Sequence, residues 1–346
     1  MKNICFVLLA FFIFSCNKKN DVVRSFCYWK TDLKFNSDDD SIIKDLKLKH
    51  MFVRFFDVDW SSSENEPVPV ADIQNIYLNK SNIDITPSVF ITNEVFLKAS
   101  KPQLDTLALR IIKRIEEIKE NKRKIRIKAI YPKIDFKEIL IDCDWSPKSK
   151  QNYFYLLGLI KKNAPQVKIT ATIRLWQYKY ATKAGIPPVH KGLLMCYNIT
   201  KPNDINTKNS IGTSAELAQY ITHNKYKLKL DVALPLYSWA VVFRGGQYKG
   251  IISDYEKLMN DSIPLKQIAP ENYILKQDML LGNTYLRNGD LIRVEKISND
   301  ELDKMISIVK RKIEIDNQTK ISFFSFDKKH INNYGIQNLS EYYARF

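Results

Sequence analysis

The sequence is poor in the patterns on which metal and nucleophile catalysis usually depend. It has 4 His residues, and none is spaced from another as HxxxH or HxH. A His-rich zinc site is therefore not predicted. A GxSxG elbow and a glycine-rich phosphate loop are also missing, which argues against a Ser-His-Asp hydrolase and against phosphate-loop chemistry. We predict neither a metal nor a cofactor.

The first residues predict export. A basic start, Met1-Lys2-Asn3, precedes an apolar run over residues 4–14 that is too short to span a bilayer. Ser15-Cys16 follows directly. We therefore predict a signal peptide over residues 1–15 and a tether over residues 16–24.

The end of this signal peptide resembles a bacterial lipobox, with the residues Ile13-Phe14-Ser15-Cys16. The resemblance implies that Cys16 is acylated and holds the protein to a membrane by lipid. Asn17 after the Cys resembles outer-membrane sorting, so we expect a lipid-anchored protein of the outer membrane or cell surface. Ordinary secretion with a coincidental Cys is the alternative.

Cysteine is scarce in the remainder of the chain. Cys27, Cys143 and Cys196 each lie inside an apolar, strand-like run. Three cysteines cannot pair completely, so we predict buried free thiols.

The chain is strongly basic, with a formal net charge of +16 from 54 basic and 38 acidic residues. Lys dominates this excess and is scattered over predicted helix faces. No zinc-finger, helix-turn-helix or RNA-binding signature occurs. We expect no nucleic-acid partner, and attraction to an anionic cell surface or polysaccharide accounts for the charge. The sequence leaves protein partners unknown.

Short apolar runs alternate with amphipathic stretches over residues 25–346, as in βα units. The strongest helical pattern covers residues 103–121, and further helices are predicted over residues 149–162, 213–224 and 299–315. Capping boxes are expected for Thr213 with Glu216 and for Ser298 with Glu301. The predicted strands are 26–31, 51–59, 83–91, either 125–129 or 139–145, 167–176, 192–199, 228–237 and 321–326. This alternation predicts a single α/β domain, a (β/α)8 TIM barrel.

Residues 240–320 break this alternation between the seventh and eighth strands. The segment contains Gly245-Gly246 and the run TYLRNGDLIRVE, in which Asn288-Gly289 favours the tight turn of a hairpin. We expect too few apolar residues for a separate core, and therefore a long excursion from the barrel. Loops of this length on the catalytic side of a barrel usually shape a pocket.

The run ILIDCDWS, residues 139–146, places two carboxylates in an otherwise apolar strand. Because side chains alternate along a strand, Asp142, Asp144 and Ser146 are expected on one face. Barrel enzymes place their chemistry at the carboxyl ends of the strands, so Asp142 and Asp144 are candidate catalytic residues. The structural alternative is that Arg or Lys side chains neutralise these acids.

Two further strands offer side chains suited to a sugar, which presents apolar faces and hydroxyl edges. Shared faces are expected for Thr172, Arg174, Trp176 and Tyr178 on strand five, and for Pro235, Tyr237 and Trp239 on strand seven. Ordinary core packing of the aromatic residues is the alternative. An Arg within an apolar strand needs an anionic partner, and for Arg174 we expect Asp142 or Asp144.

Strand two, with the run RFFDVDW, has two polar faces. Alternation puts Asp57 and Asp59 on one face and Arg54 and Trp60 on the other. Only one of these sets can enter the barrel, and the sequence leaves both choices open.

Two motifs resemble those of family 18 glycoside hydrolases, the chitinase-like barrels. ILIDCDWS is similar to their strand-four pattern, Asp-x-x-Asp-x-Asp-x-Glu, with Asp142 and Asp144 at matching positions. MCYN, residues 195–198, is similar to their strand-six run Met-x-Tyr-Asp. The resemblance implies that Tyr197 and Asn198 contact a substrate acetamido group.

The match departs from the family at three positions. Ile139 stands for the first Asp of the strand-four pattern, and Asn198 stands for the strand-six acid. Ser146 stands for the Glu that serves as general acid, and a serine hydroxyl cannot protonate a leaving glycosidic oxygen near neutral pH. The resemblance therefore implies a barrel fold with a degenerate catalytic position.

These observations predict an envelope-anchored protein that binds a carbohydrate and has lost glycosidase catalysis. The expected ligand-binding residues are Arg174, Trp176, Tyr197, Asn198, Tyr237, Asp57 and Asp59. An active glycoside hydrolase that uses Asp142 or Asp144 with another carboxylate is the first alternative. A structural envelope lipoprotein without a small ligand is the second.

Overall fold

The computed structural model describes residues 21–79, 82–120, 126–129, 136–222, 225–260 and 263–346. The predicted signal peptide and Cys16 lie outside these residues. Among the helices of the described segments, none is long and apolar enough to cross a membrane.

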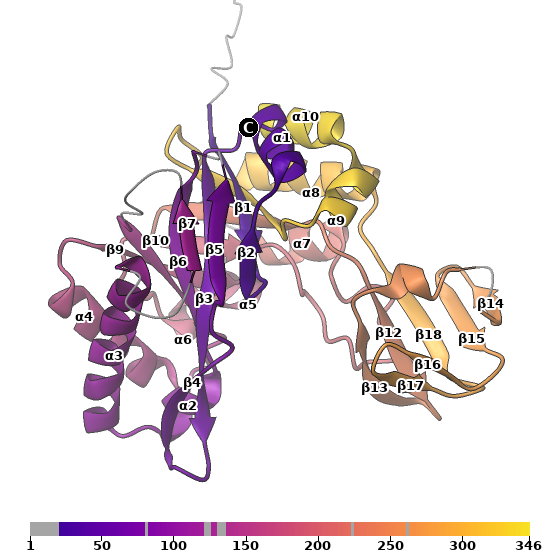
Figure 1. Cartoon of the computed structure of the whole chain (residues 1–346), viewed down its shortest axis with the longest axis horizontal. Helices are drawn as coiled ribbons and strands as arrows, with labels where there is room; N and C mark the ends of the chain where they lie inside the picture. The colour runs from indigo at the N-terminus through magenta and orange to yellow at the C-terminus, as the bar shows by residue number, and fades with distance from the viewer. Residues whose placement is uncertain (1–20, 80–81, 121–125, 130–135, 223–224, 261–262) are drawn as a thin grey trace, which may run out of the picture.

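Eight parallel strands form a closed ring, which confirms the predicted barrel (Figure 1). Neighbouring strands pair in chain order, and the last strand pairs with the first. Each predicted strand region contains one of them, with 139–145 entering the barrel in place of 125–129. The barrel strands are β1 (Val23–Tyr28), β3 (His50–Ser61), β6 (Asp84–Ile91), β8 (Glu138–Asp142), β9 (Lys168–Arg174), β10 (Lys191–Met195), β11 (Leu230–Pro235) and β19 (Lys320–Phe324).

Helices cover the outside of this ring, and the four predicted helices are present. They are α3 (Lys101–Lys119), α4 (Lys150–Asn163), α7 (Ser214–Tyr220) and α8 (Asn299–Lys312). The apolar stripe of α3 is buried, as its periodicity predicts. The other helices are short, namely α1 (Ser37–Asp45), α2 (Asn93–Lys98), α5 (Leu175–Lys179), α6 (Ala181–Ala184), α9 (Lys328–Tyr334) and α10 (Ile336–Ala344).

The two predicted capping boxes have different outcomes. Thr213 and Glu216 form the complete reciprocal box at the start of α7. At the start of α8 the Ser298 hydroxyl accepts from the Glu301 backbone N–H, but the Glu301 carboxylate accepts from the Ser214 backbone N–H instead. The second box is therefore half formed, and its acid links α8 to α7.

A small parallel sheet lies outside the barrel and contains the other candidate strand region. It consists of β2 (Asp32–Lys34), β5 (Asn75–Asn79) and β7 (Arg126–Ala129). A further strand, β4 (Glu66–Val70), pairs antiparallel with the end of β3.

The excursion forms a lobe of antiparallel strands beside the barrel (Figure 1). Its main sheet has the order β13-β12-β18-β15-β14. The strands of the lobe are β12 (Trp239–Arg244), β13 (Gln247–Ile252), β14 (Leu265–Ala269), β15 (Asn272–Leu275), β16 (Met279–Leu281), β17 (Thr284–Leu286) and β18 (Leu291–Glu295), and a 3-10 helix, η1 (Tyr255–Lys257), follows β13.

Two expectations for this lobe are wrong. It has its own cluster of buried apolar residues, which includes Val242, Leu275 and Ile292, because alternating residues of several short strands face one another. Asn288-Gly289 does not close a hairpin between its flanking strands, since β17 pairs with β16 and β18 pairs with β12 and β15. Gly289 has a positive φ of 88°, and its N–H donates to the Leu275 carbonyl, so the turn redirects the chain between two pairings.

The cysteine prediction is confirmed. Cys27, Cys143 and Cys196 are free and buried, and burial raises the pKa of each thiol. They are packed as small apolar side chains rather than poised as nucleophiles.

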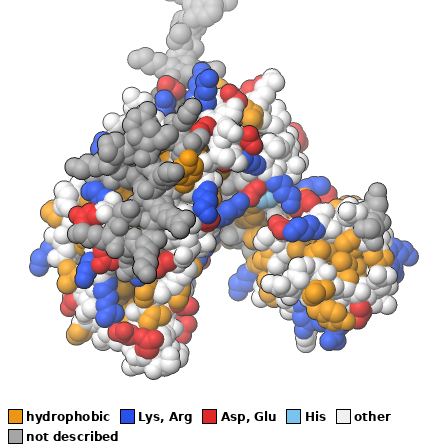
Figure 2. Space-filling view, viewed as in Figure 1, with side chains coloured by type: hydrophobic (Ala, Val, Ile, Leu, Met, Phe, Trp, Pro, Cys, Tyr) orange, Lys and Arg blue, Asp and Glu red, His pale blue; other side chains and the backbone are white. Residues whose placement is uncertain are grey.

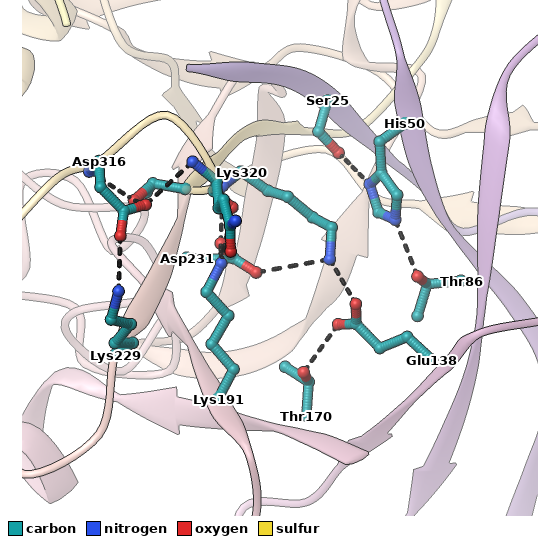
Figure 3. A network of polar contacts seen from close by, with 12 residues as sticks. Ser25, His50, Thr86, Glu138, Thr170, Lys191, Lys229, Asp231, Asp316 and Lys320 are labelled. Carbon is teal, nitrogen blue, oxygen red and sulfur yellow. Dashed lines mark hydrogen bonds and ion pairs between the residues drawn. The ribbon is translucent and has the colours of Figure 1, made fainter. Parts of the chain in front are cut away.

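Charged side chains fill the amino end of the barrel interior (Figure 3). Lys320 contacts Glu138 at 2.5 Å and Asp231 at 3.8 Å, and Lys191 contacts Asp231 at 2.5 Å. Thr170 donates to the second oxygen of Glu138. Two cations and two carboxylates therefore balance one another, as buried charges require.

Candidate functional site

Asp142 is the last residue of β8 and lies at the carboxyl end of the barrel interior. Its side chain is buried, and one oxygen accepts a hydrogen bond of 2.6 Å from the Thr172 hydroxyl on β9. The pKa of Asp142 is raised to about 6, because burial disfavours the charged carboxylate and Asp144 lies nearby, with Arg174 offsetting part of this effect. Asp142 is therefore a carboxyl group that changes charge close to neutral pH.

Arg174, the last residue of β9, pairs with Asp144 rather than with Asp142. Its Nη2 donates to Oδ2 of Asp144 at 2.7 Å, and its Nε donates to Oδ1. The Arg174 side chain is 20% exposed and that of Asp144 is 47% exposed. The predicted anionic partner is thus present, and it is the outer one because β8 ends at Asp142 and the following loop turns Asp144 toward solvent.

A β-bulge in β3 decides which face of strand two enters the barrel. The pairing with β6 shifts between Arg54 and Phe56, so Phe55 is the extra residue. Arg54 and Asp57, expected on opposite faces, form a two-point ion pair instead, with Nε of Arg54 2.7 Å from Oδ1 of Asp57. Strict alternation fails across the bulge, because the extra residue moves each following side chain to the opposite face of the strand.

Asp57 lies toward the site, whereas Asp59 and Trp60 contact other residues near the end of β3. Asp57 contributes to the raised pKa of Asp142, which places the two carboxyl groups near each other. Asp59 accepts from the Trp60 backbone N–H and from the Thr92 hydroxyl, both at 2.8 Å. The Trp60 ring faces the Lys98 ammonium of α2 at 5.8 Å.

Aromatic rings gather at the neighbouring strand ends. Tyr197 lies 6.0 Å from Tyr237 and 5.0 Å from Phe324, measured between ring centroids. Trp239 lies 5.1 Å from Tyr237, and Trp29 lies 5.6 Å from Phe324. Trp29 and Trp239 are half-buried, so the edge of this aromatic cluster reaches the surface.

Asn198 joins this cluster through Tyr237, whose hydroxyl donates to Oδ1 of Asn198. Asn198 itself is exposed and has a positive φ of 52°, a conformation that Asn tolerates better than most residues. Burial raises the pKa of both Tyr197 and Tyr237, so both hydroxyls stay protonated and can donate. Arg174 lies close enough to both rings to influence their pKa values, which brings Arg174, Tyr197 and Tyr237 into one group.

A buried ion pair connects the lobe to the loop that follows Asn198. Arg293 and Glu295 of β18 contact at 2.8 Å and are almost fully buried. Arg293 also donates to the carbonyls of residues 202, 204 and 205. The second oxygen of Glu295 accepts from the Ser210 backbone N–H at 2.9 Å and from the Trp239 indole at 2.7 Å.

Two other sequence expectations at strand four and strand five are wrong. Ser146 does not face the site with Asp142, because the strand has ended; its hydroxyl lies 3.2 Å from that of Ser149 in the turn into α4. Trp176 and Tyr178 are not on a strand, because β9 ends at Arg174 and both lie in α5. Tyr178 is buried against Tyr226, away from the aromatic cluster. Trp176 is half-buried directly after Arg174.

Sequence reasoning missed Trp29, Phe324 and Glu295. Trp29 directly follows β1 and Phe324 ends β19, so the rule that barrel sites use strand ends could have found both. No local signal marks Glu295, because its partners are distant in the chain. In the segments with described structure, no group of three His, Cys, Asp or Glu side chains is arranged to hold a metal ion.

Comparisons with known proteins assign neither a family nor a function to this chain. No family model matches the sequence, and a search of curated proteins gave no match. A chitinase from Ipomoea carnea is similar in structure, with 10% identity, a TM-score of 0.45, and coverage of 92% of this chain and 99% of that chain. The C-terminal domain of ChiA from Legionella pneumophila has 11% identity, a TM-score of 0.40, and coverage of 92% and 96%.

A GH53 catalytic domain from Ignisphaera aggregans has 11% identity, a TM-score of 0.39, and coverage of 88% of this chain and 84% of that chain. All three TM-scores are below 0.5. The assignment of the fold therefore rests on the strand pairings of this chain, and function has to be argued from its own residues.

Proposed function

We propose that the carboxyl end of this barrel binds a glycan without hydrolysing it. The observation that carries the proposal is the combination of a partly exposed aromatic cluster with carboxylates that are already bonded. Asp144 is held by Arg174, and Asp57 is held by Arg54. Asp59 accepts two hydrogen bonds of its own.

The aromatic cluster supports the carbohydrate half of the proposal. Pyranose rings have apolar C–H faces that pack on aromatic rings, and hydroxyl edges that exchange hydrogen bonds with a few fixed polar groups. Trp29 and Trp239 supply partly exposed rings. Asn198 and the Arg174–Asp144 pair supply donors and acceptors at the same end of the barrel.

The bonded carboxylates support the non-catalytic half. Glycoside hydrolysis needs a carboxylic acid at the leaving oxygen and, in most families, a second carboxylate as base or nucleophile. Ser146 stands at the position where the chitinase-like barrels carry their acid, and it bonds within a turn. A carboxylate that is paired with an arginine is a weaker base and nucleophile than a free one.

An active glycoside hydrolase is the second candidate, and one observation favours it. The pKa of Asp142 of about 6 suits a general acid near neutral pH. In this alternative Asp142 donates the proton, and Asp144 leaves Arg174 to act as the second carboxylate.

Two measurements on the same protein distinguish these candidates from a purely structural role. The first is binding to a glycan array, followed by titration calorimetry with chito-oligosaccharides. The second is turnover of a panel of aryl glycosides by wild-type protein and by Asp144→Asn and Asp142→Asn variants. We expect binding without turnover.

Trp29→Ala removes a partly exposed ring of the aromatic cluster, and Tyr285→Ala is its matched control because Tyr285 is an exposed aromatic residue of the lobe. Loss of one stacking ring lowers affinity by up to about tenfold, so we expect such a loss in the first variant alone. Turnover that disappears in both Asp variants would establish the hydrolase instead. Absence of both binding and turnover would leave the structural role.

We also propose that the protein is held to the outer membrane or cell surface through Cys16. Support comes from the sequence, in which the apolar run over residues 4–14 ends at Ser15-Cys16. A glycan-binding barrel on such a tether is retained at the cell envelope.

A further inference from the structure

A cavity lies at the amino ends of two neighbouring barrel strands, whereas the proposed glycan site lies at their carboxyl ends. Residues that lead into β11 and β19 line it, and its volume is about 170 Å3. Pockets for drug-sized ligands usually measure about 300–1,000 Å3, so this cavity suits a small group. We call it the amino-end cavity; its main lining residues are Lys225, Tyr226, Lys227, Lys229, Lys312 and Thr319.

The lining of the amino-end cavity is predominantly basic. Lys229 is paired with Asp316 at 2.7 Å, as Figure 3 shows. Lys225, Lys227 and Lys312 form no ion pair with a described residue, and besides Asp316 the lining includes one further carboxylate, that of Glu314. The cavity therefore has an excess of positive charge around a concave surface, which attracts an anion.

Tyr226 adds a donor that the protein itself leaves unused. Its hydroxyl oxygen is buried and has no hydrogen-bond partner among the described residues. The ring stacks on Tyr178, with centroids 5.3 Å apart and planes 20° apart, so its orientation is fixed. Burial raises the pKa of Tyr226, which keeps the hydroxyl protonated. A buried donor without a partner is rare in native proteins, and an acceptor oxygen that enters as the flexible lysine side chains move aside would satisfy it.

We propose that the amino-end cavity binds a phosphate group. A phosphate presents several acceptor oxygens and up to two negative charges, which matches the unpaired ammonium groups and the Tyr226 hydroxyl. The group can belong to a soluble phosphate ester or to an anionic lipid headgroup. The Val23 N–H donates to the carbonyl of Thr319, a lining residue, so β1 enters the barrel at the same end as the cavity.

Titration calorimetry of the full chain at low ionic strength tests this site, with inorganic phosphate and glycerol 3-phosphate as probes and glycerol as the neutral reference. Tyr226→Phe removes the hydroxyl and keeps the stacked ring, and a Lys227→Ala, Lys312→Ala double variant removes two unpaired charges. A Lys266→Ala, Lys276→Ala double variant in the lobe has the same change in net charge and is the matched control. We expect at least a tenfold loss of phosphate affinity in the cavity double variant, a several-fold loss in Tyr226→Phe, and wild-type affinity in the control.

Sedimentation of the Cys16→Ala chain with vesicles distinguishes the two sources of phosphate. Stronger binding to phosphatidylglycerol than to phosphatidylcholine vesicles, reversed by glycerol 3-phosphate, assigns the cavity to a headgroup. Phosphate binding without this preference assigns it to soluble esters. The proposal fails if wild-type protein binds neither phosphate probe more tightly than glycerol, or if the lobe variant loses as much affinity as the cavity variants. Because the glycan measurements use other residues, either proposal can fail without the other.

Discussion

Arg174 binds Asp144 through two guanidinium nitrogens, Nε and Nη2, and leaves the buried Asp142 with the Thr172 hydroxyl as its hydrogen-bond donor. Two carboxylates that are two residues apart therefore have different environments. Asp144 is half-exposed and paired, whereas Asp142 is buried and its pKa is raised to about 6. Asp142 is the group through which pH acts on this end of the barrel.

The two neighbours of Asp142 act on its pKa in opposite directions. Arg174 lowers the pKa of Asp142 and Asp144 raises it. Arg174→Met should therefore raise the pKa of Asp142 above about 6, and Asp144→Asn should lower it. Titration of the Asp142 carboxyl carbon by NMR measures both shifts. Shifts of the same sign in the two variants would contradict the arrangement.

Arg174→Met should also reduce the free energy of unfolding by about 1–3 kcal/mol. The pair is partly exposed, so its loss lies between that of an exposed pair, under about 1 kcal/mol, and that of a buried pair, about 3–5 kcal/mol. Lys304→Ala, which removes an exposed pair with Asp300, is the matched control and should have little effect. Denaturant unfolding at pH 7.5 measures both values.

Asp142 should make the folded barrel less stable as pH rises from about 4 to 6. The pKa of Asp142 is about 6 in the folded protein and 3.8 in its ordinary state, so between these values the folded protein holds a proton that the unfolded chain has released. This contribution to stability is complete below pH 4 and is lost as pH passes 6.

Asp142→Asn should remove the loss of stability that occurs as pH rises from about 4 to 6. The variant is then more stable than wild type at pH 7.5, by up to about 3 kcal/mol, and equal to it near pH 4. Unfolding by denaturant at the two pH values measures the difference. Equal stability of the two proteins across this range would refute a raised pKa.

His50 should act in the opposite pH direction. Its ring nitrogens lie 2.8 Å from the hydroxyls of Ser25 and Thr86, and burial with the nearby Lys320 lowers the pKa of His50 well below 6.5 (Figure 3). Below pH 6.5 the His50 ring is protonated in the unfolded chain but stays neutral in the folded protein. The free energy of unfolding therefore falls by up to about 1.4 kcal/mol for each pH unit.

His50→Gln keeps a side chain with a donor and an acceptor but does not titrate. Its unfolding free energy should fall less than that of wild type between pH 6.5 and 5. Ring NMR signals of His50 that remain those of neutral imidazole at pH 5.5 give independent support. A ring that protonates near pH 6.5 would refute the assignment.

Glu295 should hold the lobe and the loop of residues 202–210 in place. Glu295→Gln leaves Arg293 buried without its counter-charge, which typically costs about 3–5 kcal/mol. Faster hydrogen exchange of the Ser210 amide should accompany this loss. Lys296→Ala breaks an exposed pair with Glu271 on the same strand end and should cost under about 1 kcal/mol.

Cys16→Ala should release the protein from the membrane fraction, or leave it unprocessed, because no acyl chain can be attached. Metabolic labelling with palmitate and cell fractionation measure this directly. Ser15→Ala keeps a small residue before the Cys and is the control. Unchanged membrane retention of Cys16→Ala, together with an unlabelled wild-type protein, would exclude the lipid anchor.

Basic and acidic side chains are interspersed on the visible face of the molecule, as expected from lysines scattered over helix faces (Figure 2). Hydrophobic side chains are also visible on the lobe in this view. Exposed large apolar and aromatic residues of the lobe include Tyr248, Ile268, Leu280 and Tyr285. The lobe therefore has apolar side chains at its surface as well as in its core.

The sequence by itself determined the barrel, its helices and the buried thiols. These features follow from patterns within one segment: apolar runs for the barrel strands, a helical stripe in α3, and cysteines within apolar runs. The polar character of the strand ends was also local, so Asp142, Arg174 and Tyr197 could be chosen before any contact was known.

Tertiary structure decided which of these residues meet. The bulge at Phe55 places Arg54 beside Asp57. Because β8 ends at Asp142, Asp144 lies in the following loop and pairs there with Arg174. The lobe obtained a core because β18 pairs with β12 and β15 rather than with the strand before it. The periodicity of apolar residues indicates only the direction in which each side chain points from its own backbone. Ion pairs and strand partners depend on distances between segments, which are fixed only when the whole ring has closed.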